Sequence, residues 1–285
     1  MNIERRSQPK GLDIVPRDIR FAIEQARGTH WLGGDPVGTA VMNALSLTFP
    51  DGEKLFVDAV RHFRERVDGT LRDEVKRFIA QEAAHSREHH ALNQLVDTTK
   101  YPVAEILAHV RERIGMTRAR GPYAMLLATI ALEHFTAMMA DLHMVHRELF
   151  ENADPEITRL WRWHALEETE HKAVAYDVFM VVTRHWSPLK RYQLRCWSMA
   201  YITWQFTRNI ANHAVSLLAA DGYDPKTARK AVRRFLWGKP GLFRRGWRLY
   251  FAWYRPGFHP WDHDNRASIA AWRAEFETLN AGRAG

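Results

Sequence analysis

Apolar residues recur along this chain mostly at helical spacing, and the alternating pattern of half-buried strands is nearly absent. Proline and glycine divide the chain into segments. The sequence predicts helices at 38–48, 51–67, 70–96, from 103 onward, 122–150, 155–185, 188–220, in short pieces over 226–254, and at 266–280. The segments 1–37 and 256–265 are expected to be irregular. The predicted fold class is therefore all-α.

Three helix boundaries carry specific signals. Phe-Pro-Asp-Gly at 49–52 is expected to end the first helix, because proline lacks the backbone N–H that a helix interior needs. Thr70 and Asp73 resemble a capping box at the start of a later helix. Asp154 is predicted to cap a helix that has Pro155 at its first position.

This order of elements predicts one domain with three parts. Residues 1–37 form an N-terminal segment, 38–186 a four-helix bundle, and 187–285 a helical extension that packs on the bundle. With 285 residues, 46% of them hydrophobic, the chain can bury a sizeable core. The longest apolar stretch, 123–132, is about half of the ~20 residues that span a bilayer, so we expect no transmembrane helix.

Two of the predicted helices carry the same arrangement of acids and histidines. Helical projection places His164, Glu168 and His171 within an arc of about 60°. Glu82 and His85 share a similar stripe on an earlier helix. Glu-x-x-His thus occurs on two long helices. Di-metal carboxylate bundles combine two such pairs with one glutamate from each of two further helices.

The two further glutamates can be sought on the remaining helices. Glu133 interrupts a stripe of apolar or small side chains, where a carboxylate is costly unless it is paired or metal-bound. Glu53 shares its helical face with apolar residues. Glu65 and Glu74 are weaker candidates, because they lie among charges near a turn. The predicted metal ligands are therefore Glu53, Glu82, His85, Glu133, His164, Glu168 and His171.

Neighbouring polar residues are expected to have other roles. His89 is either an ordinary hydrogen-bonded core histidine or a residue that holds a ligand in place. Glu167, at the edge of the ligand stripe, is a second candidate for holding a ligand. A solvated position is also expected for Glu167, as for Glu88 and Glu170. Asp177 is expected to take part in an ion pair.

The ligand types indicate which metal would bind. Four carboxylates bring four negative charges, which two divalent ions would neutralise, and a bundle core of low dielectric tolerates a neutral cluster. Mixed carboxylate and imidazole ligands suit iron or manganese better than calcium or a closed zinc site. The predicted cofactors are two metal ions, iron first, with manganese or a mixed pair as alternatives.

The motifs also resemble known families. Over roughly 15–265, the chain resembles a bacterial family of predicted metal-dependent hydrolases of the ferritin-like superfamily, in the motifs FPDGEKLF, QEAAHSREHHALN, LEHFTA, WHALEETEHKAVAYDVF and YRPGFHPWD. This resemblance implies a ferritin-like bundle with a metal site. The spacing of His164, Glu168 and His171 is similar to the last ligand helix of di-iron p-aminobenzoate N-oxygenases. That similarity implies seven protein ligands but no particular substrate.

Three functions are compatible with such a site. The first is a di-iron enzyme that activates O₂ to oxidise a small organic or lipid-like substrate. Such an enzyme would receive its electrons from an electron donor. Thr129, Ala137 and Ala140 would leave space beside its metals. The alternative is a hydrolase that uses a metal-activated water. We rank it second because dinuclear hydrolases more often take their ligands from loops at sheet edges. Metal storage is third, and the long C-terminal extension argues against it.

The net charge of +8 is unevenly distributed. Residues 226–255 contain ten Lys or Arg and no Asp or Glu. A continuous helix over 241–255 would carry aromatic residues on one face, which are Phe243, Trp247, Tyr250, Phe251 and Tyr254. That face would pack on the bundle or in a homodimer, or lie on a membrane surface.

Other partners and locations are also constrained by the sequence. The chain has no recognisable nucleic-acid-binding motif and no nucleotide-binding loop, so we expect no nucleic-acid partner. The single Cys196 and the lack of a secretory signal pattern favour a cytoplasmic protein, with the inner membrane face as a second location.

Overall fold

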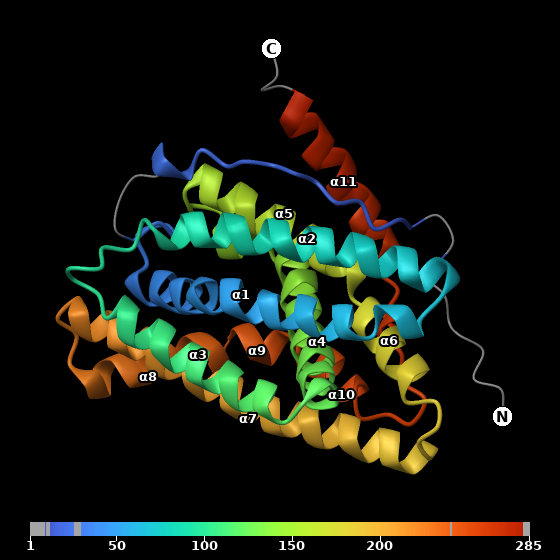
Figure 1. Ribbon diagram of the computed structural model, residues 1–285. Coiled ribbons are helices and arrows are strands. Elements are labelled where there is room, and N and C mark those ends of the chain that lie inside the picture. Colours follow the sequence, from blue (N-terminus) through green and yellow to red (C-terminus); the bar gives the residue numbers. More distant parts are fainter. Residues whose placement is uncertain (1–8, 10–11, 26–29, 240, 282–285) are drawn as a thin grey trace.

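The structure is a computed structural model that describes residues 9, 12–25, 30–239 and 241–281. In these residues no strand occurs, and the single isolated β-bridge joins Leu32 and Ala153. The predicted all-α fold class is therefore confirmed, as a helical bundle (Figure 1). The helices are α1 (Pro36–His62), α2 (Gly69–Asn93), α3 (Val103–Ala119), α4 (Pro122–Val145), α5 (Pro155–His171), α6 (Val174–Val182), α7 (Pro188–Ala220), α8 (Pro225–Trp237), α9 (Leu242–Arg245), α10 (Trp247–Ala252) and α11 (Arg266–Ala281).

Helix α1 continues through Pro50, so the predicted end of a helix at 49–52 is wrong. A proline inside a helix leaves the carbonyl four residues earlier without its usual donor. Here that carbonyl belongs to Ser46, and it accepts a hydrogen bond from the Asn93 side chain at 3.0 Å. The Pro50 carbonyl also accepts from the Ser86 hydroxyl at 3.0 Å. Helix α2 thus compensates for the break that local sequence predicts.

Helices α1 and α2 fold back on each other as neighbouring antiparallel helices (Figure 1). The turn ends at Gly69, whose φ of 51° lies in the left-handed region that glycine adopts most easily. The capping box predicted at Thr70 does not form, because α2 begins at Gly69 and its N-cap residue, Asp68, makes no side-chain cap.

The helix predicted over 155–185 is two helices. Asp154 caps α5 as expected, since its side chain accepts from the backbone N–H groups of Glu156 and Ile157. The chain then breaks at Lys172, whose ammonium donates to the carbonyl of His263 and to Oδ1 of Asn265. A second correction concerns the helix predicted over 122–150, which ends at Val145 and is followed by a short 3-10 helix.

Two hydrophobic clusters fill the bundle, and a polar layer separates them. On α1, residues up to Phe49 belong to one cluster and residues from Leu55 to the other. On α2, the boundary between the two clusters falls between Phe78 and Ala84. Glu53 and Glu82 occupy the gaps between these apolar stretches on α1 and α2. The bundle therefore has a buried polar centre with an apolar half on either side.

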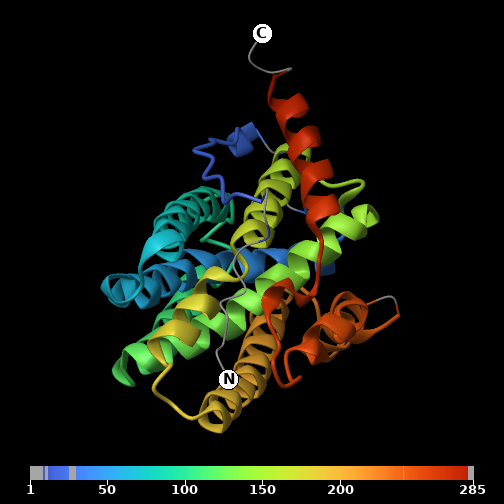
Figure 2. The same ribbon diagram turned by 90° about the vertical axis from the view of Figure 1, so that its right-hand side faces the viewer.

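The C-terminal helices cover the bundle from outside. Helix α7 packs against α1 and α4, α8 packs against α7 and α1, and α11 packs against α5 (Figure 2). Within the N-terminal segment, residues 12–25 run as a largely extended trace over α2 and α5 (Figure 1), where Gln81 donates to the Val15 carbonyl at 3.2 Å.

Residues 241–255 do not form the continuous amphipathic helix that the sequence predicts. The segment breaks at Gly246, between α9 and α10, and a side chain at this position would collide with Met138. Phe243, Tyr250 and Tyr254 pack on the bundle. Trp247 and Phe251 are 53% and 60% exposed, so this pair alone keeps an outward position.

Helix α4 is long and apolar enough to cross a membrane by length and composition alone. However, 61% of the most apolar 18-residue stretch of α4 is buried, and the helix carries the buried Glu133. It packs against α1, α5 and α7. This burial is typical of the core helix of a soluble protein.

Candidate metal centre

The structure brings all seven predicted ligands together in the polar layer. Their exposure is 4% or less in every case. They come from four helices, as Glu53 on α1, Glu82 and His85 on α2, Glu133 on α4, and His164, Glu168 and His171 on α5.

These side chains form three overlapping groups that could each hold a cation. In each group, one ligand atom per residue lies within 4.8 Å of the others. The groups are Glu53 with His85 and His164, Glu82 with His85 and Glu168, and Glu82 with Glu133 and His171. Because the groups share Glu82 and His85, they form one continuous cluster.

Most carboxylate oxygens of the cluster have no hydrogen-bond partner among the described residues. This holds for both oxygens of Glu53, Glu82 and Glu133 and for Oε2 of Glu168. Nε2 of His171 lies 3.1 Å from a Glu82 oxygen, but without the direction of a hydrogen bond. A buried polar group without a partner costs about 1–3 kcal/mol, and more when it is charged. So many unpaired oxygens facing one another are the donor set of a cation site, and the residues fit a metal centre.

The electrostatics of the cluster indicate that it needs positive charge. Burial, and then the neighbouring Glu82, raise the pKa values of the Glu53 and Glu133 carboxyls well above their usual range. Burial opposes ionisation of Glu168 as well, but His171 and hydrogen-bonding histidines hold its pKa well below the usual range. Without a metal, protons must therefore supply part of the charge that balances these acids.

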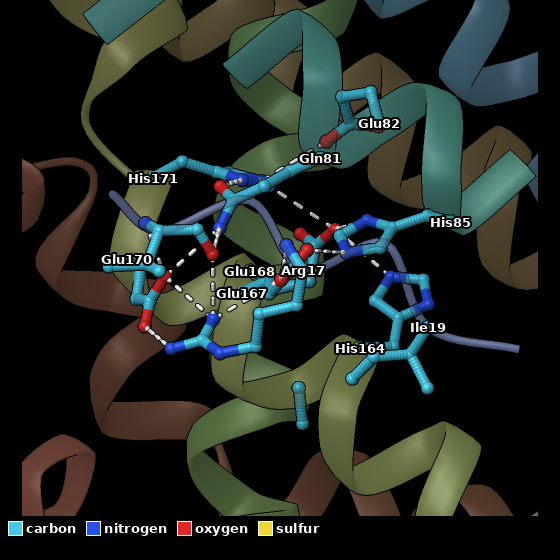
Figure 3. Close-up of polar contacts among 12 residues, drawn as sticks. Arg17, Ile19, Gln81, Glu82, His85, His164, Glu167, Glu168, Glu170 and His171 are labelled. Atoms are coloured by element: carbon cyan, nitrogen blue, oxygen red, sulfur yellow. Dashed lines mark hydrogen bonds and ion pairs between the residues drawn. The ribbon is translucent and has the colours of Figure 1, made fainter. Parts of the chain in front are cut away.

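His85 is held by Glu167 (Figure 3). Nε2 of His85 donates to Oε2 of Glu167 at 3.1 Å, which leaves Nδ1 facing Glu168 at 3.4 Å. Burial works against the imidazolium form, yet the hydrogen bond to Glu167 and the nearby carboxylate of Glu168 raise the His85 pKa to about 10, so a metal at Nδ1 would displace a proton. Nδ1 has no hydrogen-bond partner in the described part of the chain. It is therefore the nitrogen available to a metal.

His171 is held in the same manner by an amide. Nδ1 of His171 donates to Oε1 of Gln81 at 2.8 Å, which leaves Nε2 pointing at Glu82 and Glu133. Burial opposes the imidazolium form, but Glu168 and Glu82 raise the pKa of His171 well above its usual value, so a metal at Nε2 would displace a proton. The Gln81 amide nitrogen in turn donates to Glu170 at 3.0 Å. Glu170 thereby fixes which way the Gln81 amide faces (Figure 3).

His164 is oriented by a chain of hydrogen bonds that begins at Asn93. The Ser46 hydroxyl donates to Oδ1 of Asn93 at 2.7 Å, so its oxygen must accept from Nδ1 of His89 at 2.9 Å. Nε2 of His89 then accepts from Nδ1 of His164 at 2.6 Å. This arrangement turns Nε2 of His164 toward the cluster, 3.0 Å from Glu168. His89 thus lies where a residue that orients a ligand would lie.

Glu167, Glu170 and Glu88 are buried, so their predicted solvated positions are wrong. Arg17 pairs with Glu167 at 3.2 Å and with Glu170 at 2.7 Å. Arg273 of α11 donates to Glu170 at 2.8 Å. Glu88 accepts from Arg20, Arg87 and the backbone of Phe21. The helical projection gave their direction relative to the ligands but not the segments that cover them.

Sequence reasoning missed four residues that hold the cluster in place, namely Arg17, Ser46, Gln81 and Glu170. Gln81 precedes a predicted ligand and lies one helical turn before His85, which is the one local signal that could have indicated it. Arg17 comes from a segment about 150 residues away in the chain from its partners, so no local pattern points to it.

The remaining sequence candidates lie outside the cluster. The Glu65 side chain is 71% exposed, and Glu74, although buried, belongs to none of the three convergent groups. Asp177 forms the expected ion-pair contact, with Nε2 of His259 at 3.1 Å.

Comparison with known families matches this chain over residues 15–264 to the family described as predicted metal-dependent hydrolase. The match covers most of the chain and includes all seven convergent side chains. The chain belongs to this family. Membership implies a metal-dependent enzyme, and the family description fits the hydrolase alternative of the sequence analysis better than O₂ activation. No curated protein and no solved structure matches the chain.

Proposed function

We propose that the seven convergent side chains hold two divalent metal ions, iron in the first place, with manganese or a mixed pair as alternatives. The observation that carries this proposal is the set of buried carboxylate oxygens without partners in the described residues. Four carboxylates balance two divalent charges, so the filled centre would be neutral. That is the state a dry bundle interior tolerates.

The helical origin of the ligands supports a ferritin-like centre. Helices α2 and α5 each contribute a Glu-x-x-His pair, and α1 and α4 each contribute one glutamate. This is the arrangement of di-metal carboxylate bundles. His164 adds a seventh ligand, as the resemblance to the N-oxygenases implies.

We propose hydrolysis of a small organic substrate as the first reaction class, because the family description names it. When bound, such a metal pair supplies either a water made nucleophilic for attack on an ester, amide or phosphoester, or electrons for O₂ activation. The protein's own contribution is to exclude bulk water and to aim three histidine nitrogens into the carboxylate cluster. Glu167, Gln81 and His89 perform the aiming through the bonds described above.

Oxidation with O₂ is the second candidate, and the donor set favours it. All seven donors stand on helices in a water-poor core, whereas dinuclear hydrolases more often use loop ligands at sheet edges. This function would require an electron donor as an additional partner. The two candidates differ in one measurable requirement, which is the need for O₂.

The discriminating experiment reconstitutes the protein with Fe(II) or Mn(II) without oxygen and offers a panel of esters and phosphoesters under argon. Hydrolysis predicts metal-dependent turnover under argon, which Glu82→Gln abolishes and the exposed control Glu65→Gln retains. Oxidation predicts no turnover under argon and O₂ uptake in proportion to bound iron after air is admitted. A protein with two bound metals and neither activity would contradict both proposals.

A further inference from the structure

A cavity lies directly against the candidate metal centre, between α1, α4 and α5. His164 and Glu168 form part of its wall, so a molecule inside it would touch two of the seven convergent side chains. The rest of the wall is mainly apolar and includes Met42, Phe49, Met139, Ala140, Leu149 and Trp161.

The cavity agrees only in part with the space expected from the sequence. Of the three small residues named there, Ala140 lines this cavity. Ala137 lines a second cavity, beside Lys172 and α10. The Thr129 hydroxyl donates to the Met125 carbonyl within its own helix. Access to the centre therefore lies on the Ala140 side of α4.

His143 supplies a polar position in the wall, away from the metal centre. It is 8% exposed, and its Nε2 has no hydrogen-bond partner among the described residues. Burial, and then Arg162 and Arg147, lower the pKa of His143 to about 3, so the ring is neutral. A buried neutral imidazole can donate to or accept from one polar group of a ligand.

We propose that this cavity is the substrate site and that it takes a neutral, mainly apolar molecule whose one polar group is bound by His143. This proposal names a substrate class for the proposed function and rests on that function. The residues that line the cavity include no lysine or arginine, and Glu168 is acidic, so a carboxylate or phosphate inside it would contact no cationic side chain. A neutral molecule needs no such contact.

The size of the cavity restricts the ligand to a narrow shape. Its volume is about 70 Å³, roughly half of the ~150 Å³ of an engineered apolar cavity that binds benzene. A molecule of only a few carbons therefore suits this space. Met42 and Met139 are flexible side chains that can adjust to a longer chain.

The test uses 1-butanol as probe and butyrate as its charged counterpart. Of the nine methionines, Met42 and Met139 line the cavity, and Met199 lies buried in the other cluster. Methionine methyl NMR is recorded on the protein as purified and after metal removal by chelation. Butanol is expected to shift the signals of Met42 and Met139 and leave Met199 unchanged, whereas butyrate leaves all three unchanged.

Matched variants locate the binding. Ala140→Leu fills the cavity and is expected to weaken butanol binding at least tenfold, while Ala137→Leu on the same helix changes it less than twofold. His143→Phe keeps the ring shape and is expected to weaken binding at least threefold. Equal binding by A140L would overturn the cavity as the site, equal binding of butyrate would overturn the neutral class, and unchanged binding by H143F would overturn the polar anchor.

The two proposals fail separately in this design. Butanol binding after chelation, in a protein that takes up no metal, would overturn the metal centre and leave the cavity proposal standing. Metal uptake with no butanol effect on Met42 or Met139 would overturn the cavity proposal and leave the metal centre standing.

Discussion

Glu167 accepts a hydrogen bond from Nε2 of His85 at 3.1 Å, and both side chains are fully buried. This contact decides which histidine nitrogen faces the carboxylate cluster. Arg17 holds the other Glu167 oxygen at 3.2 Å, so the acid is fixed on two sides. Side chains that orient metal-binding histidines in this manner typically change metal affinity 10–100-fold when mutated.

Replacing Glu167 by glutamine should therefore weaken metal binding about 10–100-fold while the fold stays intact. Glutamine keeps the size of the side chain but loses the charge that favours the Nε2–H form of His85. Competition with a chromophoric chelator measures the affinity. Glu65→Gln, at an exposed position, is the control and should bind like the wild type. Unchanged affinity in E167Q would show that Glu167 does not hold a ligand.

The metal-free protein should become more stable when one acid of the cluster is removed. Glu133 is 2% exposed and neither of its oxygens has a hydrogen-bond partner in the described residues. Replacing it by methionine, an apolar residue of similar length, should raise the free energy of unfolding by about 1–3 kcal/mol. Urea unfolding after chelation measures the difference. A clear loss of stability in Glu133→Met would mean that the acid is a structural element and not a costly functional one.

The convergence of the seven side chains could be predicted from sequence, because it depends mainly on helical period. Glu82 with His85 and Glu168 with His171 face inward on any regular helix, and Glu133 stood out in an apolar stripe. The course of α1 could not be predicted, because Pro50 is accommodated by the Asn93 side chain of another helix. The burial of Glu170 likewise depends on Arg17 and Arg273, which lie 153 and 103 residues away in the chain.

Lowering the pH should weaken the contact between the C-terminal end of α7 and the loop that follows α2. Asp221 lies there and accepts from Lys100, from the Tyr101 hydroxyl at 2.7 Å, and contacts His30 at 3.1 Å. Burial alone would raise the Asp221 pKa, but these partners lower it below its usual value. A carboxyl with a lowered folded-state pKa stabilises the fold above its unfolded-state pKa of about 3.9, and this contribution is lost as the pH falls through the folded-state pKa.

Asp221→Asn should therefore lower the free energy of unfolding by about 1–2 kcal/mol at pH 7, and the difference from wild type should shrink below about pH 4. Urea unfolding at pH 7, 5 and 3 measures both. Asp73→Asn, whose side chain is 64% exposed, is the control. A difference that stays constant over this range would contradict the assignment of the effect to the Asp221 charge.

The basic C-terminal region should bind anionic membrane surfaces at low salt. Trp247 and Phe251 are exposed on α10, in a region of ten cationic and no acidic residues, and exposed aromatic and basic residues together favour the lipid interface. Co-sedimentation with vesicles of phosphatidylserine and phosphatidylcholine should exceed that with phosphatidylcholine alone. The double variant Trp247→Ser and Phe251→Ser should reduce it several-fold. Indifference of the wild type to anionic vesicles would end this hypothesis and leave self-association as the alternative role of the exposed pair.

The metal content of protein purified from iron-rich cultures tests the central claim most directly. Elemental analysis should find two metal ions per chain in the wild type and in Glu65→Gln, and fewer than one in Glu82→Gln and in His171→Gln, with the helical circular dichroism signal unchanged in all four. A folded wild-type protein that binds no metal, or variants that retain both ions, would contradict the account.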